Sequence, residues 1–283
     1  IDQGLFRLTD SGAAGFGDIF LNSGAGIEMR PVGNSSMGNP LEGSGTIEKS
    51  GTGNLSLTAE SIRSDALKVT QGSLSIKNVL ETEQIHLLSN TSLDVGTLRI
   101  ADQTHLQIAN QGRFGFRKMQ VIGTDNRISG NMPSAAGKEL YFILSPFTLS
   151  GDTMLRVDGR SLNVDGASLT LASLGPLKYL SKGDTFTLID RTSGLISRLD
   201  EEQTVEYGAF SYLFSVDQKS LENEPTVKES SNDNEPETPL TLTLQSSSLT
   251  GGSAGAAKAY LESSLAGLHT VALGGRFVAT TGI

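Results

Sequence analysis

The sequence predicts an all-β protein: a parallel β-helix (a solenoid), a β-rich C-terminal cap and a terminal α-helix. Three observations support this fold class. Glycine makes up 33 of the 283 residues, whereas hydrophobic residues are 37% and aromatic residues 6%, which is typical of short strands joined by tight turns. Short segments of alternating apolar and polar residues recur along the chain. Between residues 46 and 128 these segments repeat at a nearly constant step.

The first 42 residues predict short strands separated by turns. Apolar pairs lie between glycines at 18–21 (DIFL) and 26–29 (GIEM), and Gly-Ala-Gly and Asn-Pro separate them.

The repeat itself begins near Thr46. Segments 54–57, 73–76 and 92–95 lie 19 residues apart, and segments 67–69 and 85–87 lie 18 apart. Each segment has an apolar-polar-apolar pattern, so we expect one face of the strand to be buried and the other to be exposed to solvent. One such coil cannot bury its apolar side chains alone, and stacking of coils makes the core. A β-sandwich also has short alternating strands, but the even step favours the solenoid.

The pattern changes near Met132. An apolar strand at 139–144 ends at Ser145-Pro146, and two Asp-Gly pairs, at 158–159 and 165–166, predict tight reversals. Segment 182–190 (KGDTFTLID) predicts a strand entered by a turn, and segments 210–216 and 240–244 predict a final strand pair.

An acidic segment at 217–239 separates the last two strands. It has seven acidic residues, two lysines and three prolines, with almost no apolar side chain. Because it cannot offset its ordering entropy, we expect a mobile loop. After it, residues 255–273 are rich in alanine, with Leu261, Leu265, Leu268 and Ala272 at helical spacing.

Three of these segments resemble one family, the autotransporters of type V secretion. Residues 43–76, GSGTIEKSGTGNLSLTAESIRSDALKVTQGSLSI, resemble the passenger-associated transport repeat. Residues 183–194 resemble the C-terminal part of pertactin-like passengers, where the autochaperone caps the β-helix. The order A-x-K-A-Y-x-E-x-x-L-A-x-L near residue 260 resembles the linker helix before the translocator barrel.

The resemblance implies three regions. Residues 1–131 would form a right-handed parallel β-helix, 132–250 the cap or autochaperone, and 251–283 the helix leading to a β-barrel that is not in this chain. That barrel is the expected partner, and the helix would thread it. The implied folding-nucleus residues are Phe186, Leu188, Ile189, Tyr212 and Phe214, and the implied barrel-threading residues are Tyr260, Leu261, Leu265 and Leu268.

The resemblance also implies where the chain acts. We expect the bacterial cell surface, at the outer membrane, or secretion after transit through the periplasm. The role would be a stalk or adhesin, with a host-cell or bacterial surface ligand as a further partner. The alternative is the carrier stalk of a secreted enzyme (protease, esterase or glycan-active) whose catalytic part lies upstream. The chain starts at Ile1 without a signal sequence, and we expect it to be part of a longer precursor.

No residue set predicts catalysis, cofactor binding or metal binding, so we expect no enzyme activity. Secreted proteases of this family carry Gly-Asp-Ser-Gly, and the nearest segments here, 151–154 and 183–186, lack the serine. His86 and His105 are at polar positions of alternating strands, and a pair lacks the further ligands of a metal site. His269 belongs to the expected linker helix.

Other candidate groups have structural interpretations. Asp158, Asp165, Asp184 and Asp190 could act as glycosidase carboxylates, but each lies beside a glycine or at a strand end, where aspartate sets a turn. Phe114 and Phe116, two apart on one strand face, predict a core ladder in preference to a sugar platform.

Charge and cysteine content exclude some partners and some kinds of site. The formal charge is −9, so nucleic acid would be repelled and is not an expected partner. The chain has no cysteine, which removes disulfides and thiolate metal sites and suits a protein that crosses the periplasm unfolded. No apolar run approaches the ~20 residues of a membrane helix.

Overall fold

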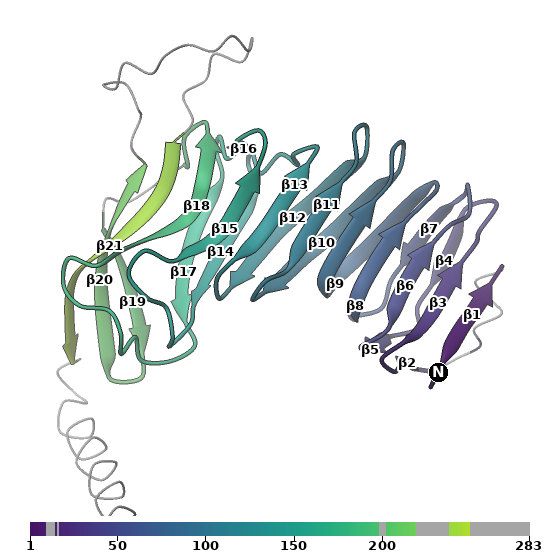
Figure 1. The fold of residues 1–283 in the computed structure, drawn as a ribbon, viewed down its shortest axis with the longest axis horizontal. Helices are drawn as coiled ribbons and strands as arrows, with labels where there is room; N and C mark the ends of the chain where they lie inside the picture. Colours follow the sequence, from purple (N-terminus) through teal and green to yellow (C-terminus); the bar gives the residue numbers. More distant parts are fainter. Residues whose placement is uncertain (10–14, 16, 198–201, 219–237, 250–283) are drawn as a thin grey trace, which may run out of the picture.

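A computed structural model describes residues 1–9, 15, 17–197, 202–218 and 238–249. Across these residues the chain is all-β, and its main part is a parallel β-solenoid (Figure 1). Each coil passes through three strand positions, so that three parallel stacks run along the long axis. We name these stacks faces A, B and C.

Along face A, each strand pairs in parallel with the strand of the next coil, from β1 to β18. In order, its members are β1 (Gly4–Leu8), β3 (Ala25–Met29), β6 (Thr46–Lys49), the second half of β8 (Ser61–Val69), the end of β9 (Ser73–Leu87), β11 (His105–Ile108), β13 (Asn126–Gly130), β15 (Thr153–Asp158) and β18 (Thr185–Ser193).

Faces B and C complete each coil. Face B holds β4 (Ser35–Met37), β7 (Asn54–Leu57), the starts of β9, β10 (Ser92–Ala101) and β12 (Arg113–Ile122), and β16 (Leu162–Asn163). Face C holds β2 (Ile19–Leu21), β5 (Leu41–Gly43), the start of β8, the middle of β9, the ends of β10 and β12, β14 (Glu139–Leu144) and β17 (Ser168–Ser173).

The predicted repeat is confirmed by the strand register. Asn54 pairs with Ser73, and Ser73 pairs with Ser92, so the 19-residue step is one coil of face B. Leu67 pairs with Ile85 on face A, which is the 18-residue step. The inward side chains of successive coils form one continuous apolar core. Alternation along each strand therefore specifies which residues enter that core.

Corners between faces use backbone conformations that few side chains adopt. Asn90 and Gln111 have φ of 61° and 67° at the corner from face A to face B, one coil apart. Gln103 and Asp125, with φ of 67° and 58°, occupy the corner from face C to face A in the same way. The turn geometry thus repeats with the coil, which keeps the strands in register.

The coil extends beyond residue 131, where we expected the cap to begin. Strand β14 pairs in parallel with β12 and β17, and β18 pairs in parallel with β15 and β16. The pairs Asp158-Gly159 and Asp165-Gly166 lie at corners between faces, so the predicted tight reversals are wrong. A turn signal in the sequence does not distinguish a solenoid corner from a hairpin.

An antiparallel unit closes the coil. It contains β19 (Glu202–Tyr207), β20 (Phe210–Gln218) and β21 (Thr238–Leu249), and β21 also pairs antiparallel with β18 (Figure 1). The predicted final strand pair is confirmed as β20 and β21. Asp217 and Gln218 belong to β20 and Thr238 and Pro239 to β21, while the rest of the expected acidic loop, 219–237, is outside the described residues.

Candidate functional site

The two described histidines lie on neighbouring strands of face A and contact different side chains. His86 is opposite Gln107, and its Nδ1 lies 3.0 Å from Gln107 Oε1. His105 is opposite Gln84, and its Nε2 lies 2.9 Å from Ser129 Oγ. Burial, then the charge of Arg127, lowers the pKa of His105 below 6.5, although Asp158 opposes this. Within the described ranges no three His, Cys, Asp or Glu residues could hold a metal ion.

The candidate carboxylates have three different structural roles. Asp184 Oδ2 accepts from Ser181 N at 2.7 Å, which is the predicted turn. Asp190 Oδ1 instead accepts from Val157 N at 2.8 Å and joins β18 to β15. Asp158 forms an ion pair with Arg127 at 3.4 Å.

The backbone of Asp165 stabilises the corner between β16 and β17. Its N–H donates to Asn163 Oδ1, and its carbonyl accepts from Gly137 N. Phe114 and Phe116 are buried, with ring centroids 5.9 Å apart, so the predicted core ladder is confirmed.

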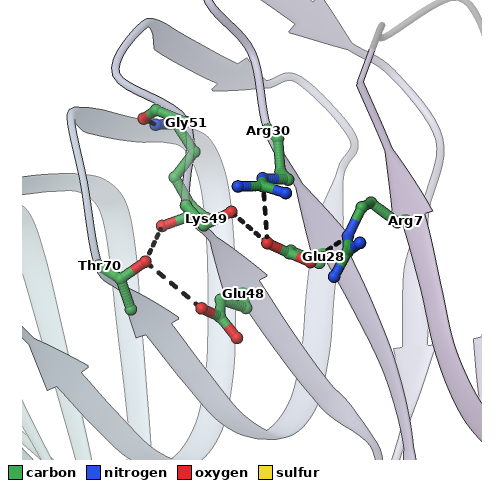
Figure 2. A network of polar contacts seen from close by, with 8 residues as sticks. Arg7, Glu28, Arg30, Glu48, Lys49, Gly51 and Thr70 are labelled. Carbon is green, nitrogen blue, oxygen red and sulfur yellow. Dashed lines mark hydrogen bonds and ion pairs between the residues drawn. The ribbon is translucent and has the colours of Figure 1, made fainter.

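A polar network lies across the first coils of face A (Figure 2). Glu28 points outward but is only 7% exposed, since it lies between Arg7 at 2.6 Å and Arg30 at 3.3 Å. Ser50 Oγ donates at 2.6 Å to Glu28 Oε1, the oxygen that also faces Arg30, whereas Arg7 contacts Oε2. The hydrogen bonds from Ser50 and Arg7 lower the pKa of Glu28 despite its burial. This network links three successive coils through their side chains.

Lys49 is the unusual member of this region. It follows Glu48 on β6 and points inward, in the row that contains Met29 and Val69, with no exposed surface. Its Nζ donates to the carbonyls of Gly51 and Gln71, the latter at 2.8 Å. Burial lowers the pKa of Lys49 to about 8. Both acceptors are neutral, so the ammonium group is held by carbonyl dipoles.

A groove of about 620 Å³ runs along the corner between faces C and A. Its floor includes Ser64 and Thr82, which are 3% and 4% exposed and continue into a buried polar row with Thr104 and Asn126. The rim carries exposed and half-buried groups from successive coils, chiefly Phe20, Glu42, Arg63, Asp65, Glu83 and Asp102.

The charges beside the groove are arranged as a ladder. Glu81 pairs with Arg63 at 3.5 Å and with Arg99 at 3.3 Å on adjacent strands of face C. Asp102 Oδ1 accepts from Thr124 N at 2.9 Å. The rim can accept hydrogen bonds and disfavours anions.

The five folding-nucleus candidates lie together where the coil meets the cap. Phe186, Leu188 and Ile189 are on β18, and Tyr212 and Phe214 are on β20; all are at most 4% exposed. The rings of Phe186 and Phe214 meet edge to face, with centroids 5.8 Å apart. Tyr212 Oη accepts from Leu177 N at 2.9 Å. Their shared packing makes this junction one cluster, and its role in folding stays a prediction.

The predicted barrel-threading residues Tyr260, Leu261, Leu265 and Leu268, and His269, lie outside the described residues. The expected terminal helix therefore has no structural support. Within the described part, no helix is long and apolar enough to cross a membrane.

No protein-family model, curated protein or solved structure matches this chain. Sequence reasoning did not identify the groove or Lys49 as features of interest. Lys49 has the same strand parity as the buried Ile47, which was the available signal. No sequence pattern indicated the groove, because the residues of its rim lie about one coil apart along the chain.

Proposed function

We propose that this chain is the C-terminal passenger region of an outer-membrane autotransporter and acts as a surface-displayed β-helical stalk or adhesin. One observation carries the proposal. The segment that resembles the transport repeat, residues 43–76, forms successive coils of a parallel solenoid that an antiparallel unit closes. In this proposal the solenoid is right-handed, and the terminal segment is the linker helix to the chain's own translocator barrel.

The proposal assigns the closing unit a role in secretion. The junction of β18 with β20 and β21 buries aromatic and aliphatic side chains from both parts. If it folds first outside the cell, each preceding coil can stack on a finished neighbour. The free energy of folding would then favour outward movement of the chain.

The outer faces of the solenoid are the proposed contact surface of the displayed chain. A solenoid offers long, regular outer faces, which suit contact with a host-cell or bacterial surface ligand. We assign the chain no catalytic step and no cofactor.

Protease treatment of intact cells that produce the whole gene product tests the proposal. We expect release of a fragment that contains residues 1–250, with a periplasmic marker protein left intact as the control. Complete protection of the chain inside cells would overturn outward display. Adhesion is then tested by comparing binding of displaying and non-displaying cells to host cells.

A further inference from the structure

Two long corner loops carry an exposed apolar patch beside the cap. Loop 145–152 joins β14 to β15, and loop 174–184 joins β17 to β18, both at the corner from face C to face A. At the same corner β8 and β9 continue from one face to the next without interruption. The last two coils therefore carry additional chain at one place on the surface.

Large apolar side chains are exposed on these loops. Phe147 is 73% exposed, Tyr179 56%, Leu174 54% and Leu149 49%. The rings of Phe147 and Tyr179 stack, with centroids 6.4 Å apart and an interplanar angle of 26°. Elsewhere the coil directs its apolar side chains mainly into the core, so a gathered apolar surface indicates an interaction site.

Both loops are held in shape by their own hydrogen bonds. Asp152 Oδ2 accepts from Leu149 N, and Asp184 Oδ2 accepts from Ser181 N, each at 2.7 Å. Leu174 N donates to Leu144 O at 3.0 Å, which fixes the start of loop 174–184 to the end of β14. The apolar tips are thus preorganised, and a partner need not order them on binding.

The formal charges of the two loops cancel, since they carry two lysines and two aspartates, and the kind of partner is inferred from where the lysines lie. Lys178 and Lys182 are exposed, whereas the carboxylates of Asp152 and Asp184 face backbone N–H groups of the loops. Aromatic and leucine side chains flanked by lysines are the composition of protein surfaces at the membrane–water interface. The net charge of −9 acts weakly here, because charges beyond about 10 Å are screened at 0.1 M salt.

We propose that loops 145–152 and 174–184 form a contact site for a phosphate-bearing lipid surface. Phe147, Leu149, Leu174 and Tyr179 enter the boundary between headgroups and acyl chains, and the two lysines meet lipid phosphates. This inference goes beyond the proposed function, because neither display nor adhesion requires the passenger to touch a lipid surface.

Co-sedimentation of the purified chain with phosphatidylcholine–phosphatidylglycerol vesicles tests the site. We expect the wild-type chain to bind vesicles. The Phe147→Ser/Tyr179→Ser double variant should lose about tenfold or more of its partitioning, because it lacks the two rings that enter the lipid. A Val32→Ser/Tyr207→Ser variant is the matched control. It also removes two exposed apolar side chains, 86% and 41% exposed, from outside the loops, and should bind like the wild type.

A Lys178→Gln/Lys182→Gln variant isolates the electrostatic part. It should bind less to vesicles with phosphatidylglycerol, with a weaker dependence on salt, and should match the wild type on phosphatidylcholine alone. The proposal is overturned if the wild type does not sediment with vesicles, or if the control variant loses as much binding. It is also overturned if light scattering shows a wild-type dimer that Phe147→Ser/Tyr179→Ser converts to a monomer without any vesicle binding.

Discussion

At the scale of single residues, Lys49 departs furthest from the pattern of its surroundings. It occupies an inward position between Met29 and Val69, where every neighbour in the row is apolar. Its aliphatic stem suits that row, and its ammonium group reaches two corner carbonyls. A charge buried without an anionic partner is costly, so folding lowers the pKa of Lys49.

We expect the free energy of unfolding to rise with pH between about 8 and 10.5. The folded pKa of Lys49 is about 8, against an ordinary value of 10.5. Below pH 8 both states bind the proton and the fold carries the cost of burying it, whereas above 10.5 neither state does. Urea unfolding should therefore show a gain of about 2 kcal/mol between pH 7 and 9.5.

Lys49→Met is the control for this titration. It removes the ionisable group, so the gain over that pH range should disappear. Burial raises the pKa of Tyr212 above 10.0, which lowers stability at still higher pH in both proteins and cancels in the comparison. An equal gain in Lys49→Met would show that another group is responsible.

At the scale of elements, β18 joins the two parts of the fold. One edge pairs in parallel with β15 and β16, and the other pairs antiparallel with β21. Ile189 takes part in both pairings, opposite Leu155 and Leu240, and has no exposed surface. A change at this position therefore affects the last coil and the cap together.

Ile189→Asp should destabilise the protein by roughly 3–5 kcal/mol, because it places an unpaired carboxylate in the core. The denaturant midpoint measures this loss. In the displayed precursor, surface exposure should fall in parallel if the junction is the folding nucleus.

Thr185→Asp supplies the comparison on the same strand. Thr185 is exposed and its Oγ1 lies 2.8 Å from Thr243 Oγ1, so the variant should change stability by only about 1 kcal/mol. Equal losses in the two variants would contradict the assignment of Ile189 to a shared core. Unchanged display of Ile189→Asp would contradict the folding-nucleus role.

At the scale of the whole molecule, the two ends of the coil differ (Figure 1). Among the described strands, β1 pairs only with β3 and β2 only with β5, while Leu5 and Phe6 are exposed. At the other end, β19–β21 extend the sheet beyond the last coil. Because each coil contacts only its neighbours, local stability in this 283-residue chain taken by itself should fall toward the first coils.

Native-state hydrogen exchange should reveal this gradient. Amides of β1 should exchange faster than those at the end of β9, such as Ile85 and Leu87, by about two orders of magnitude or more. The strand β9 lies between paired strands, so its amides need larger openings. Uniform protection along the solenoid would show that it unfolds as a single cooperative unit.

Sequence alone determined the properties that depend on neighbouring residues. The alternation in 54–57, 73–76 and 92–95 identified the inward side chains and the 19-residue coil, because side-chain direction follows strand parity. It also identified the aromatic pair Phe114 and Phe116 as core residues.

Only the tertiary structure decided where parallel pairing ends and which distant groups meet. The coil runs past residue 131 to β18, Lys49 meets the carbonyl of Gln71, and Phe147 stacks on Tyr179. Each contact joins residues separated by about a coil or more, so it depends on strand register and corner geometry rather than on local pattern. For the same reason no local pattern predicted the groove, whose rim side chains come from successive coils.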